Sequence, residues 1–464
     1  MDGVIVTNTD HIETYDDVTI SHEAEHSSAL KKCLLISPHF PPSSLAGVHR
    51  MRHLSKHLKN VGWYPIVLCV HENFHEEKLE ADLARLVPDD VEVIKVAALP
   101  IEATRRLGIG DISLRARSHL RRKLFEILSE QKIDIVCITG APYYPMLLAD
   151  EIKRRHKIPV VLDFQDPWVS AWGGSQPILS KSGLSHRLAT HFEPRAIRSA
   201  SGITCVSQAQ CEALATRYPW FDRSRMVAIP IGGDADDFLA LSAQGADRAA
   251  GFLAQDRINL SYVGTIWPPV MRTLEAILSA VARVRLTHPR LYENLRFNFI
   301  GTTANSHDTT GYRVRPLADR LGISDVVYEV PQRIPYLDAL ATMVHSNGLL
   351  MLGSDEAHYS ASKIYPVLMS GRPYLSLFMR DSSSHDILVG AGGGLAYSFQ
   401  SSDAVLDIVP ELADGIVRLA IEPDTFSRAN TVAYAPYEAH AIAQRFAELF
   451  DTLHHKNSNR RLCA

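Results

Sequence analysis

The feature that most constrains the fold is a repeated alternation between short apolar runs and longer stretches with helical spacing. In the first half, helices are predicted near 48–60, 113–130, 144–156, 185–199 and 208–218. The strand-like runs of this half are residues 32–37, 64–70, 91–96, 133–139, 158–163 and 202–206. Strands that alternate with helices are joined by right-handed crossovers, so this half is predicted to form a parallel sheet covered on both faces.

The same alternation starts again after residue 226. The second set of predicted strands is 259–263, 296–300, 326–330, 348–352 and 373–377, and a late helix is expected over 436–455. A chain of 464 residues is too long for one ordinary core. The sequence therefore predicts an α/β protein with two Rossmann-like parallel-sheet domains that face a central cleft, where ligands bind beyond the carboxyl ends of the strands.

Composition sets the predicted boundaries and compartment. Residues 1–30 hold seven acidic side chains and no Lys or Arg, which indicates disorder. No apolar run is long enough to span a bilayer, and the six cysteines have no metal-binding spacing, so a soluble cytoplasmic protein with reduced thiols and no metal is expected. The predicted division is a disordered segment 1–31, a domain 32–225, a linker 226–256, a domain 257–435, and a C-terminal helix and tail 436–464 that packs back on the first domain.

Two segments of the first half place candidate ligand groups at strand ends. In SPHFPPSSLAGVHRMRHLSKHL (37–58), Ala46 and Gly47 stand before a helix, where small residues and free N–H groups favour an anion. In VVLDFQDPW (160–168), Asp163 and Asp166 flank a strand end and are candidates for sugar contact or acceptor orientation. A plain strand-to-helix turn and an Asp-capped turn remain the alternatives.

The second half offers candidate phosphate ligands. In YVGTIWPPVMRTLEAIL (262–278), Gly264 and Thr265 end a strand and Arg272 begins a helix, where a guanidinium can pair with phosphate. In SDEAHYSASKIYPVLMSGRP (354–373), Ser362 and Lys363 begin a helix that can hold a pyrophosphate. Surface positions for Arg272 and Lys363 are the alternatives. The segment IPIGGDADDF (229–238) is interpreted as an architectural crossing, and its Asp234-Ala-Asp236 spacing as a chance match to a metal motif.

Taken in order, these segments resemble the family 4 glycosyltransferases of the GT-B fold over about residues 33–455. The resemblance implies an acceptor-side first domain, a nucleotide-sugar-binding second domain, and metal-independent retaining transfer without a cofactor. It implies a nucleotide base near Gln332 and Arg333. The family carries two glutamates where this chain has His358, near the donor sugar, and Pro366. Asp355 and Glu356 lie close to the first position, so one of them is expected to substitute, and Glu356 joins Asp163 and Asp166 as a catalytic candidate.

The predicted function is therefore transfer of a sugar from a nucleoside-diphosphate sugar to an acceptor glycan, lipid-linked glycan or small molecule, in polysaccharide, glycolipid or glycoconjugate biosynthesis. The missing glutamates leave open a catalytically inactive nucleotide-binding or scaffold protein. A sugar-nucleotide epimerase with the same fold is the third alternative.

A basic segment over residues 105–123 suggests a further contact. An amphipathic basic helix can lie against anionic lipid at the inner face of a membrane, and a solvated helix face is the alternative. No nucleic-acid recognition motif accompanies it, so no nucleic-acid partner is expected. The basic residues are Arg105, Arg106, Arg115, Arg117, Arg121, Arg122 and Lys123.

Overall fold

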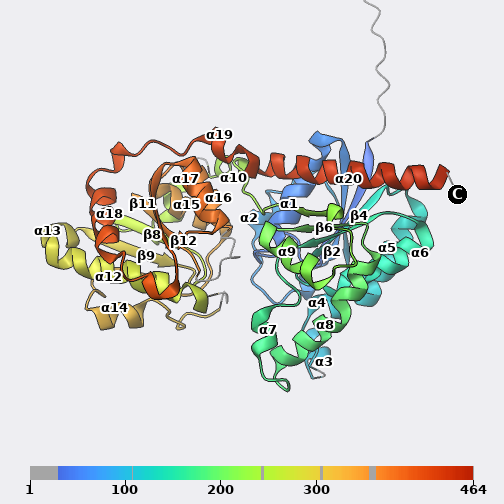
Figure 1. Cartoon of the computed structure of the whole chain (residues 1–464), viewed down its shortest axis with the longest axis horizontal. Helices are drawn as coiled ribbons and strands as arrows, with labels where there is room; N and C mark the ends of the chain where they lie inside the picture. The colour runs from blue at the N-terminus through green and yellow to red at the C-terminus, as the bar shows by residue number, and fades with distance from the viewer. Residues whose placement is uncertain (1–29, 107, 242–244, 304–306, 355–361, 463–464) are drawn as a thin grey trace, which may run out of the picture.

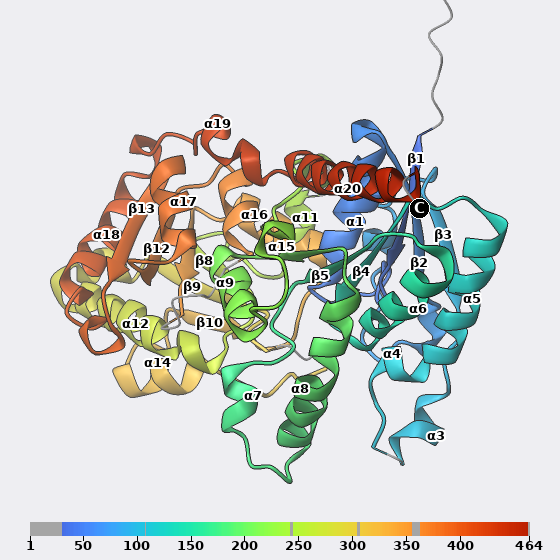
Figure 2. The ribbon, with the colours of Figure 1, turned by 45° about the vertical axis from the view of Figure 1, so that its right-hand side comes forward.

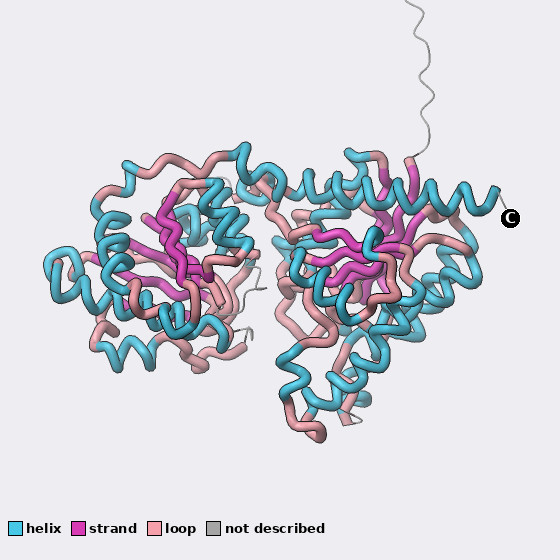
Figure 3. Tube along the Cα trace, in the orientation of Figure 1, coloured by secondary structure: helices cyan, strands magenta, loops and turns pink. Residues whose placement is uncertain are grey.

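The computed structural model describes residues 30–106, 108–241, 245–303, 307–354 and 362–462. Two separate parallel sheets, each covered by helices, lie side by side along the long axis of the molecule (Figures 1 and 3). The first has the strand order β3-β2-β1-β4-β5-β6-β7 and the second β10-β9-β8-β11-β12-β13. This is the doubly wound, two-domain α/β architecture that the sequence predicts.

The first domain is built on seven strands with helices on both faces (Figure 1). Its central strands are largely apolar because both faces are buried, as in Leu34 and Leu35 of β1, which belong to clusters on opposite sides of the sheet. The strands are β1 (Lys31–Ile36), β2 (Trp63–Val70), β3 (Glu92–Val96), β4 (Ile135–Gly140), β5 (Val160–Phe164), β6 (Gly202–Cys205) and β7 (Met226–Ala228). The helices are α1 (Val48–His57), α2 (Ala81–Ala84), α3 (Ile101–Arg105), α4 (Ile112–Arg115), α5 (Arg117–Glu130), α6 (Ala149–His156), α7 (Ala171–Ser175), α8 (Lys181–Ser199) and α9 (Gln208–Arg217).

The second domain repeats this plan with six strands. Its long helix α12 packs on the sheet through a continuous buried stripe that includes Leu274, Ile277, Val281 and Val284. The strands are β8 (Ile258–Val263), β9 (Leu295–Ile300), β10 (Val327–Val330), β11 (Gly348–Leu352), β12 (Tyr374–Met379) and β13 (Gly394–Phe399). The helices are α10 (Asp236–Leu239), α11 (Gly245–Ala249), α12 (Met271–Thr287), α13 (Pro289–Tyr292), α14 (Arg315–Leu321), α15 (Tyr336–His345), α16 (Ile364–Met369), α17 (Ser383–Ala391), α18 (Val409–Ile421) and α19 (Thr431–Tyr434).

Two strands were missed in the sequence. β7 pairs in parallel with β6, so residues 226–228 complete the first sheet instead of beginning the linker, and the run 202–206 is not its last strand. β7 is too short for a periodic signal, and the small residues of β13 dilute its apolar pattern. The boundary predicted at residue 226 therefore moves into the crossing that follows Ala228.

The C-terminal helix α20 (Ala439–Leu462) leaves the second domain and runs across the first (Figures 1 and 2). Phe446 and Phe450 are fully buried against α1 and the first sheet. The Phe450 ring packs edge-on against Trp63, with 5.4 Å between the ring centroids. One continuous helix therefore ties the end of the chain to its first domain. Of the predicted disordered segment, residues 1–29 lie outside the described residues, and Lys31 already belongs to β1.

Other sequence expectations concern the thiols and the membrane. Cys33, Cys69, Cys137, Cys205 and Cys211 are free and buried, and burial raises the pKa of the Cys33 and Cys137 thiols. Within the described part of the chain, no helix combines the length and the apolar character needed to cross a bilayer.

Candidate functional site

A cavity of about 200 Å³ lies between the two domains. The first domain contributes Ala46 and the start of α1, and the crossing segment contributes Gly232 and Gly233. Glu80 of the first domain and further residues of the crossing also line it. The second domain contributes residues at and after the carboxyl ends of strands β8, β9, β10 and β11, which is where doubly wound sheets bind ligands.

Lys363 and Gly264 form one unit of this wall. The Lys363 Nζ donates hydrogen bonds to the Thr265 carbonyl at 3.1 Å and to the Tyr262 hydroxyl at 3.3 Å. Its side chain passes directly over Gly264, where an added Cβ would stand 2.0 Å from the Lys363 Cε. Burial, together with the charge of Arg333, lowers the pKa of Lys363 to about 8. The glycine is therefore required for the lysine to reach the cavity.

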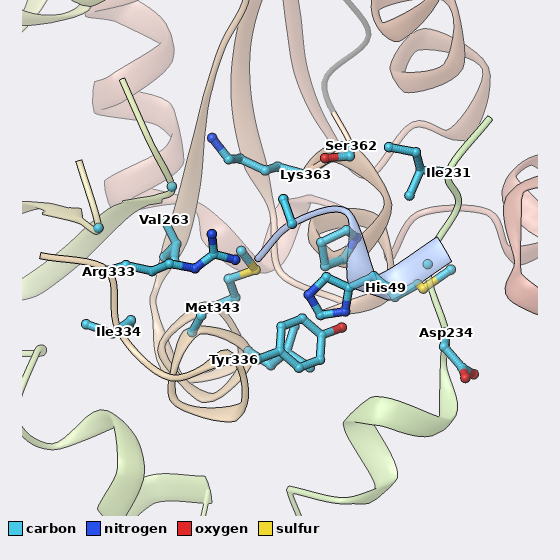
Figure 4. Close-up of a pocket in the computed structure, with 18 of the residues that line it drawn as sticks. His49, Ile231, Asp234, Val263, Arg333, Ile334, Tyr336, Met343, Ser362 and Lys363 are labelled. Carbon is cyan, nitrogen blue, oxygen red and sulfur yellow. The ribbon is translucent and has the colours of Figure 1, made fainter. Parts of the chain in front are cut away.

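Arg333 is a second cation in the same cavity (Figure 4). Burial lowers the pKa of its guanidinium, and the carboxylates of Glu80 and Glu77 offset that effect in part. Within the described part of the chain, the guanidinium makes no hydrogen bond or ion pair. Two cations that share a cavity and lack a salt-bridge partner among the described residues favour an anionic ligand.

The first domain presents two histidines on one face of α1. His49 and His53 are four residues apart, so both point into the cavity. The His49 ring packs on Tyr336 with 4.3 Å between ring centroids, and burial holds its pKa well below the usual value, which keeps it neutral at pH 7 (Figure 4). The Nδ1 of His53 is buried without a hydrogen-bond partner among the described residues. Neither histidine was among the ligands predicted from the sequence, although their helical spacing is visible there.

Contacts across the cleft hold the two domains together. The Glu80 carboxylate accepts a hydrogen bond from the backbone N–H of Tyr336 at 2.7 Å, and the Tyr336 hydroxyl donates to Asp237 at 2.7 Å. Asp237 is also ion-paired with buried Arg52. The neighbouring Asp234 lines the cavity and pairs with Lys56.

Asp163 is a correction. Its carboxylate is completely buried and pairs with Arg50, whose Nε lies 2.9 Å from both oxygens. The hydroxyls of Thr139 and Thr204 donate to the same two oxygens at 2.9 and 2.7 Å. No surface remains for a substrate, so this side chain joins β4, β5 and β6 to α1 instead of touching a sugar.

Arg272 is a second correction. It is half exposed at the start of α12, where it lies 3.7 Å from Glu275, and it does not line the cavity. A 3₁₀ turn, Pro268–Val270, separates Gly264 from this helix and carries the guanidinium away from the strand end. Arg333, which the sequence analysis placed near the nucleotide base, takes the predicted place of Arg272 as the second cation beside Lys363.

The other predicted residues lie in or around the cavity. Thr265 and Ser362 line it, while Gln332 next to Arg333 does not. Gly47 accepts a hydrogen bond from Gln165 through its carbonyl, next to Ala46 of the cavity wall. Asp166 is exposed in the loop after β5 and does not line the cavity. The predicted Glu356 and His358 lie outside the described residues.

The basic segment 105–123 is largely neutralised by the protein itself. Arg121 makes a bidentate pair with Glu151, Arg105 pairs with Glu76, and Lys123 pairs with Glu126. Arg115 is buried and donates to the Phe74 and Leu99 carbonyls at 2.8 and 3.0 Å. The exposed cations that remain are Arg106, Arg117 and Arg122.

Sequence comparisons relate part of the first domain to known glycosyltransferases. Residues 47–232 match the family model described as glycosyl transferase 4-like domain. A curated relative, the D-inositol 3-phosphate glycosyltransferase of Geodermatophilus obscurus, is 29% identical over 110 residues, a match that spans only 24% of each chain.

Solved structures match over most of the chain. Sucrose-phosphate synthase from Thermosynechococcus elongatus aligns with a TM-score of 0.58 at 14% identity over 91% of this chain and 99% of that one. HepE from Anabaena, solved with UDP and glucose, aligns with a TM-score of 0.59 at 13% identity over 91% and 100%. The chain therefore has the GT-B fold and carries a glycosyl transferase 4-like domain over residues 47–232.

Proposed function

We propose that this protein is a glycosyltransferase that moves a sugar from a nucleoside-diphosphate sugar to an acceptor. The observation that carries the proposal is the pair of cations Arg333 and Lys363, which both line the interdomain cavity, with Lys363 lying over the strand-end Gly264. Fixed cations of this kind bind a diphosphate and stabilise the charge that develops on it as the glycosidic bond breaks. The solved complexes of HepE with UDP and with UDP-glucose support this class of donor.

In this mechanism Lys363 and Arg333 stabilise the leaving diphosphate, and the contacts of Glu80 and Asp237 with Tyr336 hold the domains closed around the donor. Closure excludes water, which would otherwise hydrolyse the activated sugar. We propose retaining transfer in which no metal meets the diphosphate. Asp166, Glu356 and His358 remain proposed contacts of the sugar and acceptor, and the acceptor is a glycan, a lipid-linked glycan or a small molecule.

A panel of UDP-, GDP- and ADP-sugars tests the proposal. Donor binding should raise the midpoint of thermal unfolding in proportion to the logarithm of ligand concentration. The donor that binds should then be turned over with a mixture of candidate acceptors and release its nucleoside diphosphate. Binding without turnover or hydrolysis would favour the inactive scaffold, and a new nucleotide sugar without acceptor would favour the epimerase.

Nucleotide affinity is expected to fall at alkaline pH. Lys363 carries its charge below a pKa of about 8 and loses it above, whereas the diphosphate is fully ionised throughout this range. The dissociation constant for UDP, measured by calorimetry, should therefore rise about tenfold between pH 7.5 and 9.5. In Lys363→Met the dissociation constant for UDP should be larger than that of the wild type at pH 7.5 and should change little with pH. An equal pH dependence in both proteins would rule out Lys363 as the titrating group.

We also propose a peripheral contact with anionic lipid, centred on the hairpin of α7 and α8 beside the basic segment. Figures 1 and 2 place α3, α7 and α8 at the same end of the first domain. Residues 167–192 contain no Asp or Glu, and exposed Lys181 and Arg187 accompany the apolar side chains. Those side chains are Trp172, Ile178, Leu179, Leu184 and Leu188, of which Leu179 is 98% exposed. Apolar side chains beside cations fit the interface of an anionic bilayer.

Flotation with vesicles tests this contact. The wild-type protein should float with vesicles that contain anionic lipid and much less with neutral ones. Ile178→Asp combined with Leu179→Asp should abolish flotation, because both apolar contacts are lost and negative charge is added. Leu286→Asp changes another strongly exposed leucine, on α12 (82% exposed), and should behave as wild type. Equal flotation of all three proteins would contradict the proposal.

A further inference from the structure

A second constellation lies in the first domain, in the loops that follow β1 and β2. The Nδ1 atoms of His39 and His75 each lie 2.9 Å from the same oxygen, Oε1 of Glu77, and 3.3 Å from each other. The three side chains are 17%, 1% and 13% exposed. Because β1 and β2 are parallel neighbours, their carboxyl ends bring together residues that are distant in sequence.

Hydrogen bonding fixes the position of one proton on the His75 ring. Its Nε2 lies 3.1 Å from the carbonyl oxygen of Val70, which can only accept, so Nε2 carries the proton. In the neutral ring the Nδ1 then presents a lone pair to Glu77 Oε1, which is itself an acceptor. The same oxygen also accepts from the Ser43 hydroxyl. A metal ion bound to these two nitrogens and the carboxylate oxygen would replace the repulsion between acceptor lone pairs with three favourable bonds. A ring N–H that donates to a backbone carbonyl is also typical of metal-ligating histidines.

The distances match those of a metal site. Zinc bonds of 2.0–2.1 Å in a tetrahedral arrangement place the ligand atoms about 3.3 Å apart. The observed separations are 3.3 Å between the two nitrogens and 2.9 Å from each nitrogen to the carboxylate oxygen. Two histidines and one glutamate are an established zinc ligand set that leaves one position for water. We propose that His39, His75 and Glu77 bind a divalent transition-metal ion, with Zn²⁺ as the preferred species.

Two other clusters of potential metal ligands in the described residues differ from this one in that their carboxylates already pair with Arg or Lys. His53 with Asp234 and Asp237, and His57 with Asp234 and Asp236, also bring three ligand atoms together. There the carboxylates are already neutralised, because Arg52 pairs with Asp237 and Lys56 pairs with Asp234 and Asp236. Within the described part of the chain, Glu77 has no Lys or Arg ion pair, which leaves its charge available to a metal.

The ion would fasten two loops that form the first-domain wall of the cavity. These loops already meet through a bridge between Ser43 and Leu79 and through the Ser44 hydroxyl, which donates to the Lys78 carbonyl at 2.8 Å. Ala46 follows the first loop and Glu80 ends the second, and both line the cavity. The metal is thus proposed as a positioning element, which goes beyond the proposed transfer reaction and does not depend on it. It also departs from the expectation of no metal, which rested on the absence of a local metal-binding spacing in the sequence.

Metal binding by the full-length protein tests the site. After removal of metal with a chelator and dialysis, the protein is titrated with Zn²⁺ against a chromogenic competitor, and Co²⁺ is added separately to record visible spectra. The wild type should take up about one tight equivalent of Zn²⁺, show the intense bands of tetrahedral Co²⁺ and unfold at a higher temperature with Zn²⁺. His75→Ala and Glu77→Gln should each lose the tight equivalent. His288→Ala, which changes an exposed histidine elsewhere, should retain it.

Each outcome decides the proposal. Loss of the tight equivalent in the two ligand variants but not in His288→Ala supports the site. Equal Zn²⁺ uptake in wild type and Glu77→Gln, or weak octahedral Co²⁺ bands in wild type, would overturn it. Circular dichroism identifies a variant that fails to fold, and the Co²⁺ spectrum of the wild type decides the question without any variant.

Discussion

Replacing Lys363 by alanine should lower kcat/KM for the donor by about 100- to 1,000-fold, because a fixed cation at the leaving diphosphate is removed. Arg333→Ala should have an effect of the same order, since its guanidinium has no salt-bridge partner among the described residues and lies in the same cavity. UDP affinity should fall by about 10- to 100-fold in each variant, as expected for the loss of one charge-assisted hydrogen bond. Calorimetry with UDP and initial rates with the matching donor sugar measure both effects.

Arg272→Ala is the matched control. Arg272 was predicted from the sequence to hold phosphate, but its side chain lies outside the cavity, 3.7 Å from Glu275. This variant should change UDP affinity and kcat/KM by less than about twofold, as for an exposed side chain with a weak ion pair. A large loss in Arg272→Ala together with an unchanged Lys363→Ala would falsify the assignment of the phosphate site.

Gly264→Ala should abolish most activity although no functional group is removed. The added Cβ would stand 2.0 Å from the Lys363 Cε and 2.3 Å from its Nζ, so the lysine must leave its hydrogen bonds with Thr265 and Tyr262. The backbone at Gly264 has φ 145°, which costs a residue with a side chain about 1–3 kcal/mol. We expect UDP affinity to fall as in Lys363→Ala, with an additional decrease in stability measured by urea unfolding.

Gly62→Ala separates these two effects. Gly62 has φ 90° and nothing within 4 Å of an added Cβ, so this variant meets backbone strain without a collision. It should lose stability and retain UDP affinity and kcat/KM. If Gly264→Ala behaves in the same way as Gly62→Ala, the close packing of Lys363 over the glycine has no role in binding.

The order of secondary structure could be read from the sequence because buried parallel strands form short, mainly apolar runs without helical spacing. β1, β2 and β4 of the first domain and β8, β9 and β11 of the second stand out for this reason. β7 and β13 were missed because one is only three residues long and the other is rich in small residues at the sheet edge.

The candidate site was only partly visible in the sequence. Gly264 and Lys363 were found as separate motifs, and only the fold shows that the lysine crosses the glycine. The sequence analysis treated Asp163 and Asp166 as equal candidates after one strand, whereas their environments are opposite. Asp163 is enclosed by Arg50 and two threonines, and Asp166 is exposed. Burial depends on what the neighbouring strands and α1 contribute, which a local pattern does not contain.

The sequence by itself determined the two-domain α/β architecture and the strand ends at which a ligand would bind, because periodicity and strand-end glycines are local properties of the chain. Only the tertiary structure decided which side chains meet. In it, Asp163 is ion-paired with Arg50, Arg272 lies outside the cavity, and Arg333 lies close enough to Lys363 to lower its pKa. It also joined His39 to His75 and Glu77. These encounters depend on strand order and domain packing, which join positions far apart in sequence.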